Sequence, residues 1–174
     1  LQLVNSKLDH ARHVKPRLVV KSLACLGLLK LISAKLQTQR FMVFHLPQLV
    51  PVIEHFPNAD ILLGKPMPFN AFQSFYQRYS HYKNVNIQWL IDTRERLKQY
   101  LKYAQVHDLV LNINLEIDVG LHRGGVDSQF DFIQLLTIIE ENSKYLKLSG
   151  LMGYDAHITK LPSVIKKPEK AYEE

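Results

Sequence analysis

The chain has 174 residues, of which 47% are hydrophobic and 22% charged, and its formal net charge is +6. This composition is typical of one globular domain with its own core, and it excludes an intrinsically disordered chain. The basic residues are scattered instead of alternating with aromatic residues, which argues against nucleic-acid binding, and no apolar run is long enough to span a membrane. The single cysteine, Cys25, excludes an internal disulfide and suits a reducing cytoplasm. We therefore expect a cytoplasmic protein whose excess positive charge serves an anionic small molecule.

Strand-like and helix-like patterns alternate along the chain. Strands are expected at residues 18–20, 40–44, 60–63, 86–91, 109–117 and 146–152. Helices are expected at residues 23–36, from Pro47 to about His55, and at residues 69–82, 94–106 and 128–142, with a further helix beginning at Pro168. Because Cys25 falls within the apolar pattern of the first helix, we expect its thiol to be buried and inert.

Strands this apolar, each followed by a helix, predict a parallel sheet covered by helices. Periodicity alone leaves a doubly wound sheet and a (β/α)8 barrel both open. No Gly-x-Gly-x-x-Gly motif follows the first strand, which weakens a dinucleotide-binding interpretation. Polar residues instead gather at the carboxyl ends of several strands: Lys21, His45, Lys65, Asp92, Asp118, His122, Arg123, Tyr154 and Asp155. Convergence from many strand ends is typical of a barrel site.

Lys21 lies between the first expected strand and the first expected helix. A lysine at the carboxyl end of a buried strand can act as an amine nucleophile or a base when apolar walls reduce its solvation. The alternative is an ordinary lysine that ends a strand and reaches for water.

Five stretches together carry a resemblance to a known family. They are RLVVKSL (17–23), LLGKPMP (62–68), WLIDT (89–93), EIDVGLHRGG (116–125) and GLMGYDAH (150–157). In this order they resemble the alanine racemase-like, fold-type III pyridoxal phosphate enzymes. The nearest likeness is to the branch of predicted amino-acid aldolases or racemases that includes D-threonine aldolase and D-serine dehydratase. The resemblance implies a (β/α)8 barrel followed by a β-rich domain, so that residues 1–174 would be a partial barrel of about six βα units without that second domain.

The resemblance also implies roles for four residues. Lys21 matches the family lysine that forms the internal aldimine with pyridoxal 5'-phosphate, and Arg123 matches the arginine near the phenolic oxygen of that cofactor. Tyr154 matches the residue that packs on the cofactor ring, which is a histidine in alanine racemases, so the tyrosine argues against a plain alanine racemase. Glu116 stands where alanine racemases commonly carry a carbamylated lysine, and its carboxylate could hold Arg123 without modification.

Other polar residues of these stretches have less specific interpretations. We expect Asp118 to accept hydrogen bonds from backbone N–H groups of the glycine-rich turn. His122 faces either substrate or solvent, and Asp155 is a candidate pocket residue. Asp155 and His157 could share a metal ion, but the resemblance implies that any divalent metal is held by the carboxyl-terminal domain. We therefore assign no metal site to this chain.

The function implied is that of a pyridoxal phosphate-dependent lyase (aldolase or dehydratase) or racemase acting at Cα of a small, D-configured amino acid, in a homodimer. The cofactor's phosphate site and a second catalytic base are implied to lie outside residues 1–174, so these residues alone are expected to be inactive and to bind the cofactor poorly. One alternative is a non-catalytic single-barrel carrier of pyridoxal phosphate that serves vitamin B6 homeostasis. Another is an α/β interaction domain without a cofactor.

Overall fold

The computed structural model describes residues 4, 6–8, 13–82 and 85–156, and it contains one six-stranded parallel sheet. The strands are β1 (Leu18–Val19), β2 (Arg40–Val43), β3 (Asp60–Leu63), β4 (Ile87–Ile91), β5 (Leu111–Ile117) and β6 (Leu146–Gly153). The helices between them are η1 (Val20–Ser22), α2 (Leu26–Lys35), α3 (Leu46–His55), α4 (Phe69–Arg78), η2 (Ser80–Tyr82), α5 (Arg94–His107) and α6 (Gln129–Glu141). The predicted alternation of strands and helices is confirmed. The helix expected from Pro168 lies outside the described residues, as does His157.

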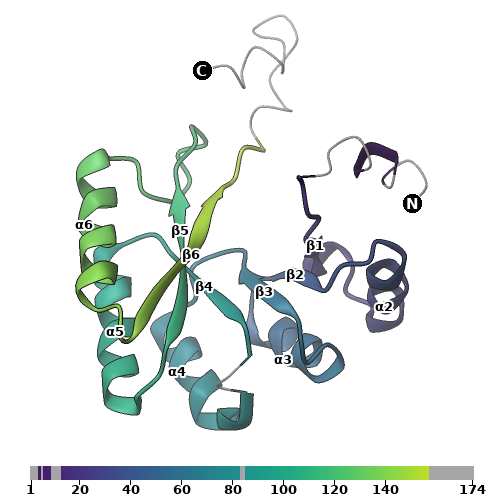
Figure 1. Ribbon diagram of the computed structural model, residues 1–174, viewed down its shortest axis with the longest axis horizontal. Helices are drawn as coiled ribbons and strands as arrows, with labels where there is room; N and C mark the ends of the chain where they lie inside the picture. Colours follow the sequence, from purple (N-terminus) through teal and green to yellow (C-terminus); the bar gives the residue numbers. More distant parts are fainter. Residues whose placement is uncertain (1–3, 5, 9–12, 83–84, 157–174) are drawn as a thin grey trace, which may run out of the picture.

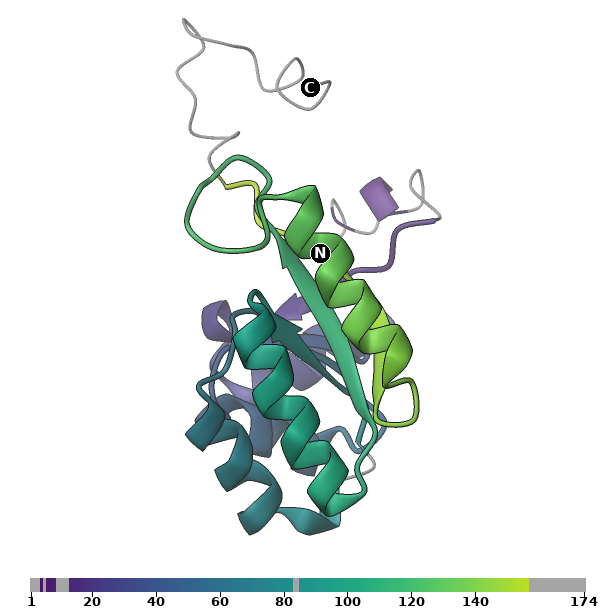
Figure 2. The same cartoon turned by 90° about the vertical axis from the view of Figure 1, so that its left-hand side faces the viewer.

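The strand order separates the two architectures that periodicity left open. Each strand pairs in parallel with the next one in the sequence, in the order β1-β2-β3-β4-β5-β6. A doubly wound sheet reverses its strand order at a switch point, whereas a barrel does not. The described helices lie along the outer side of the sheet (Figures 1 and 2). Within the described residues β1 and β6 are not paired, so the sheet has the order of a barrel but remains open.

The core lies between the sheet and the helices. Residues of β2, β3, β4 and β5 that face the helices are fully buried, among them Phe41, Ile61, Trp89 and Ile113. Aromatic side chains from α4 and α5 pack on Trp89 with their rings at centroid distances of 4.9 Å (Phe72) and 6.0 Å (Tyr100). No helix in the described part of the chain is long and apolar enough to cross a membrane.

The prediction for Cys25 was wrong, because the first helix starts later than expected. The pattern indicated a helix over residues 23–36, but residues 20–22 form a 3-10 turn and α2 begins only at Leu26. Cys25 is therefore the residue before the helix, in an extended conformation with φ −119° and ψ 113°, and it is exposed. Of α2 itself only Leu29 and Ser33 are buried.

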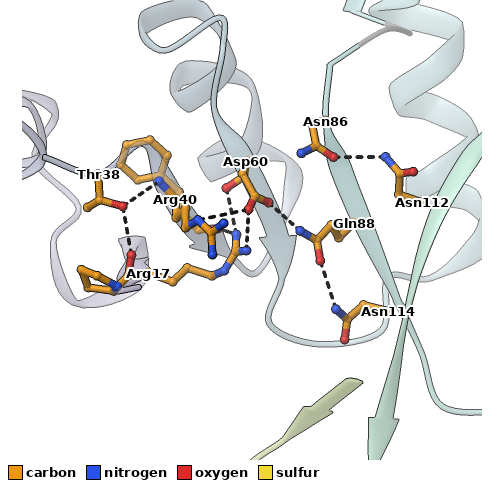
Figure 3. Close-up of polar contacts among 10 residues, drawn as sticks. Arg17, Thr38, Arg40, Asp60, Asn86, Gln88, Asn112 and Asn114 are labelled. Atoms are coloured by element: carbon orange, nitrogen blue, oxygen red, sulfur yellow. Dashed lines mark hydrogen bonds and ion pairs between the residues drawn. The ribbon is translucent and has the colours of Figure 1, made fainter. Parts of the chain in front are cut away.

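A polar network crosses the sheet near the amino ends of its strands, opposite to the polar residues noted above (Figure 3). At its centre the Asp60 carboxylate accepts hydrogen bonds from Arg17 Nη2 at 2.9 Å and from Gln88 Nε2, and it lies 3.6 Å from Arg40 Nε. Gln88 continues the network by accepting a 3.0 Å bond from the side chain of Asn114. This arrangement ties β1 through β5 together with side chains that cannot be left unpaired without cost.

Candidate active site

A cavity of about 370 Å³ opens at the carboxyl ends of the strands. Five charged side chains line it. Four follow strands (Lys21 after β1, Lys65 after β3, Asp92 after β4 and Arg123 after β5), and Glu116 lies near the end of β5. The structure thus brings together residues that are as much as 102 positions apart in the sequence, as parallel strands of a barrel do. With all five groups ionised the cavity has three positive and two negative charges, a balance that favours an anionic ligand.

Lys21 reaches this cavity from the 3-10 turn that follows β1. The turn is closed by a 2.9 Å hydrogen bond from the Leu23 backbone N–H to the Val20 carbonyl oxygen. Val20 is buried, while Lys21 is exposed to the cavity and its Nζ lies 4.4 Å from the ring centroid of Phe44. Within the described part of the chain Lys21 takes part in no ion pair. An amine held this way is available to react with a ligand.

The glycine-rich loop after β5 is held by backbone contacts and by Asp118. Asp118 Oδ1 accepts hydrogen bonds from the backbone N–H groups of Gly120 and His122, each at 3.0 Å, which confirms the role expected for this carboxylate. These donors, first that of His122, hold the pKa of Asp118 below its usual value. Val126 then returns to the strand, donating to the Glu116 carbonyl at 2.8 Å. The loop therefore has a fixed shape that delivers Arg123 to the cavity.

Glu116 is the buried carboxyl group of the site, with 7% of its surface exposed. Burial is the main cause of its raised pKa; the neighbouring carboxylate of Asp92 raises the pKa further and Arg123 lowers it. Its side chain shares one face of β5 with Asn112 and Asn114, while Leu111, Ile113 and Leu115 are buried against the helices. Glu116 therefore holds its charge less readily than an exposed glutamate, even with Arg123 nearby.

Arg123 and Tyr154 meet beside the cavity. The guanidinium carbon of Arg123 lies 4.5 Å from the ring centroid of Tyr154, a cation–aromatic contact. Tyr154 follows β6 and is 42% exposed, so its ring forms a surface at the mouth of the site. These two residues, from different loops, also line a small recess with Glu116. Arg123 and Tyr154, both noted in the sequence at strand ends, are thus neighbours in the structure.

Two further predicted residues lie to the side of this cavity. The imidazole of His122 is 82% exposed and its Nδ1 lies 2.9 Å from Asp118 Oδ2, so in this structure it faces solvent. Its backbone is left-handed, with φ +52°. Asp155 follows Tyr154 and is half-buried. In the part of the chain that the structure describes, no group of three or more His, Cys, Asp or Glu residues is arranged to hold a metal ion.

Sequence reasoning missed Phe44 and underrated Gly64. Phe44 follows β2 directly and lines the cavity, while Gly64 follows β3 on the neighbouring strand. A Cβ atom on Gly64 would lie 2.5 Å from two ring carbons of Phe44, so only glycine leaves room for that ring. The strand register, which pairs Val43 with Leu63, predicts that the two residues are neighbours once the strand order is known.

Comparison with known proteins agrees with this arrangement. Residues 1–172 match the family described as alanine racemase, N-terminal domain. A search of curated proteins found no match.

Solved structures show the same fold at low sequence identity. Histidine racemase from Leuconostoc mesenteroides is 15% identical with a TM-score of 0.71, over 97% of this chain and 45% of its own. Alanine racemase from Oenococcus oeni is 19% identical with a TM-score of 0.70, over 90% of this chain and 44% of its own. D-threo-3-hydroxyaspartate dehydratase from Delftia sp. is 17% identical with a TM-score of 0.60, over 76% of this chain and 35% of its own.

This chain thus spans less than half the length of the solved structures that it resembles. The match to the family covers nearly all of its residues, and the sequential parallel strands agree with it. The predicted family and the predicted barrel-type α/β fold are both confirmed. The chain belongs to the alanine racemase N-terminal domain family.

Proposed function

We propose that the full-length protein is a pyridoxal phosphate-dependent enzyme acting at Cα of a small amino acid, with Lys21 as the residue that carries the cofactor. The observation that supports this most directly is the cavity that joins Lys21 to Arg123 and Glu116. When bound, pyridoxal phosphate supplies an electron sink for negative charge at Cα of an attached amino acid. The family supports the cofactor and the general class of enzyme, while the reaction and the residue roles are part of the proposal.

The residues present fit such a cofactor. A volume of about 370 Å³ lies within the usual range for small-molecule sites, roughly 300–1,000 Å³. The unpaired lysine provides the nucleophilic amine, and the excess of positive side chains suits an anionic ligand. Lys21 would hold the cofactor through its side-chain amine. The same amine would be placed to hold or deliver a proton at Cα of a substrate.

Arg123 and Tyr154 are proposed to orient the ring. The guanidinium of Arg123 can donate hydrogen bonds to an oxyanion of the ligand, and its contact with the Tyr154 ring keeps it in place. The buried Glu116 carboxyl group interacts electrostatically with Arg123. Lys65 and Asp92 line the same cavity and are candidates for contacts with substrate.

Within this class we favour a D-threonine aldolase-like lyase, either an aldolase or a dehydratase, over a racemase. Tyr154 at the position of the alanine racemase histidine is the reason, together with the neighbour that is a dehydratase. We further propose that the active form is a homodimer and that residues 1–174 are inactive alone.

The test begins with full-length protein and added pyridoxal phosphate. We expect a visible absorption band that is absent in Lys21→Ala and present in a control, Lys98→Ala, which changes an exposed lysine of α5. The loaded protein is then assayed with D-threonine, D-serine and both enantiomers of alanine. Cleavage or dehydration of a D-hydroxy amino acid supports the lyase. Turnover of alanine alone would overturn that choice in favour of a racemase, and a bound cofactor without turnover would favour a carrier of vitamin B6.

A further inference from the structure

Phe44 occupies a central place in the candidate site. It is the first residue after β2, and because β2 lies between β1 and β3, Phe44 stands between Lys21 and Gly64. Its backbone N–H donates a 2.9 Å hydrogen bond to the side-chain oxygen of Gln48, in the first turn of α3. The backbone of this residue is therefore anchored while its half-buried ring borders the cavity.

The ring touches both neighbouring strands. On the β1 side the ammonium nitrogen of Lys21 lies over the ring, 4.4 Å from its centroid. On the β3 side two ring carbons lie 2.5 Å from the place where Gly64 would carry a Cβ atom. One edge of the ring thus packs against the backbone of Gly64, and its face contacts the ammonium group of Lys21.

Phe44 is not explained by packing of the hydrophobic core. The core of the described chain is formed by the helix-facing residues of the strands, such as Phe41 and Val43, and Phe44 is not among the side chains that pack there. Phe44 leaves part of its apolar ring exposed in a charged cavity, which a smaller residue would avoid. Its position over Lys21 offers a reason for that placement.

We propose that Phe44, seated on Gly64, is a positioning residue that directs the Lys21 amine into the cavity and stabilises positive charge on that nitrogen. The negative face of an aromatic ring attracts a cation within about 6 Å, more strongly where water is excluded. If this nitrogen holds the cofactor, the ring face beside it would favour the cationic form of the nitrogen. The inference rests on the proposed attachment of the cofactor to Lys21.

Other charged groups also act on this nitrogen. Two positive side chains of the cavity disfavour a further positive charge there: Lys65, which follows β3, and Arg123, in the loop after β5. The carboxylates of Asp92 and Glu116 favour it. The contribution of the ring is therefore measured as a difference between variants that leave these four groups unchanged.

Three variants of the full-length protein test the inference. Phe44→Leu keeps apolar bulk without an aromatic face. Gly64→Ala forces the ring to move, while Gly27→Ala is its matched control, because nothing lies within 4 Å of a Cβ added at Gly27. For each variant we measure the dissociation constant of pyridoxal phosphate from the visible absorption, and the pH at the midpoint of the change in that band.

In Phe44→Leu and Gly64→Ala the dissociation constant should rise by about three- to tenfold, the range that one cation–aromatic contact supports. The pH midpoint should fall, because the cationic form of the nitrogen is less stabilised. Gly27→Ala should resemble the wild type in both measurements.

The outcomes separate this inference from the proposed function. If the wild type binds no cofactor at Lys21, the proposed function fails. If the wild type binds it but Phe44→Leu has the same dissociation constant and pH midpoint, the inference is overturned while the function stands. If Phe44→Leu does not fold, as judged by circular dichroism, the comparison of Gly64→Ala with Gly27→Ala decides, and no difference between them contradicts the inference.

Discussion

Gly125 is predicted to be the glycine on which the shape of the Arg123 loop depends. Its φ is +98°, and an added Cβ would lie 2.7 Å from the Asp118 nitrogen and 2.8 Å from the Ile117 carbonyl carbon. Both of these are backbone atoms of the adjoining strand end, so they cannot move aside as a flexible side chain would. The left-handed conformation costs an alanine about 1–2 kcal/mol, and relief of the contact adds a similar amount. We expect Gly125→Ala to lower the free energy of unfolding by about 3 kcal/mol.

The neighbouring glycine provides a matched control in the same loop. Gly124 has no positive φ, and nothing lies within 4 Å of a Cβ added there, so Gly124→Ala should change the free energy of unfolding by less than about 0.5 kcal/mol. Urea denaturation of the two variants measures the difference directly, and hydrogen exchange at the Asp118 and Val126 amides locates it. A melting temperature lowered by about 6–12 °C in Gly125→Ala would accompany such a loss. If the two variants unfold within about 1 kcal/mol of each other, the reasoning from loop geometry is refuted.

Three further predictions concern charged residues. Arg123→Ala should keep the cofactor bound but lose most of its turnover, measured as kcat with the best substrate, and unchanged kinetics would remove its proposed role. Because the pKa of Glu116 is raised, its contribution to stability is present below the usual glutamate pKa and is lost as the pH rises through the higher folded value. Glu116→Gln should therefore gain stability relative to wild type between pH 4 and pH 7 in urea titrations, and a constant difference would contradict this. Asp60→Ala removes the carboxylate acceptor of Arg17 Nη2 and of Gln88 Nε2, while Arg17 Nη1 keeps its hydrogen bonds to backbone carbonyl oxygens. The substitution should cost about 2 kcal/mol in the same assay, whereas a loss below about 1 kcal/mol would show that the network is not structural.

Much of the fold could be predicted because the strands are apolar and regularly spaced. The six strands and the five α-helices of the described chain were placed to within about four residues, since apolar strands alternate regularly with amphipathic helices. The strand order was not predictable from periodicity, because a doubly wound sheet has the same pattern. The structure distinguishes a barrel from a doubly wound sheet because each strand pairs with the next one in the sequence.

The errors lie where local turns compete with helix. Leu23 and Cys25 continue the apolar pattern of the first helix, yet the chain makes a 3-10 turn at residues 20–22 and starts α2 later. The sequence offers no side-chain cap to mark that start: Cys25 makes no capping hydrogen bond, unlike Thr93 before α5 and Ser128 before α6. Both of those better-capped helices begin within one residue of their predicted positions.

The candidate site was predictable where a residue type carries its own chemistry. Lys21, Glu116 and Arg123 line one cavity, as the motifs indicated. Phe44 was not predicted, because its importance comes from the space left by Gly64 two strands away from Lys21. A contact of that kind appears only when neighbouring strands are brought into register.

The central claim is that Lys21 is the residue that carries the cofactor. Full-length protein loaded with pyridoxal phosphate is reduced with borohydride, digested, and mapped by mass spectrometry. We predict one pyridoxyl adduct, on the peptide that contains Lys21, and none in that peptide from Lys21→Ala. An adduct on Lys65, the other lysine of the cavity, or no adduct on a correctly folded protein would contradict the account.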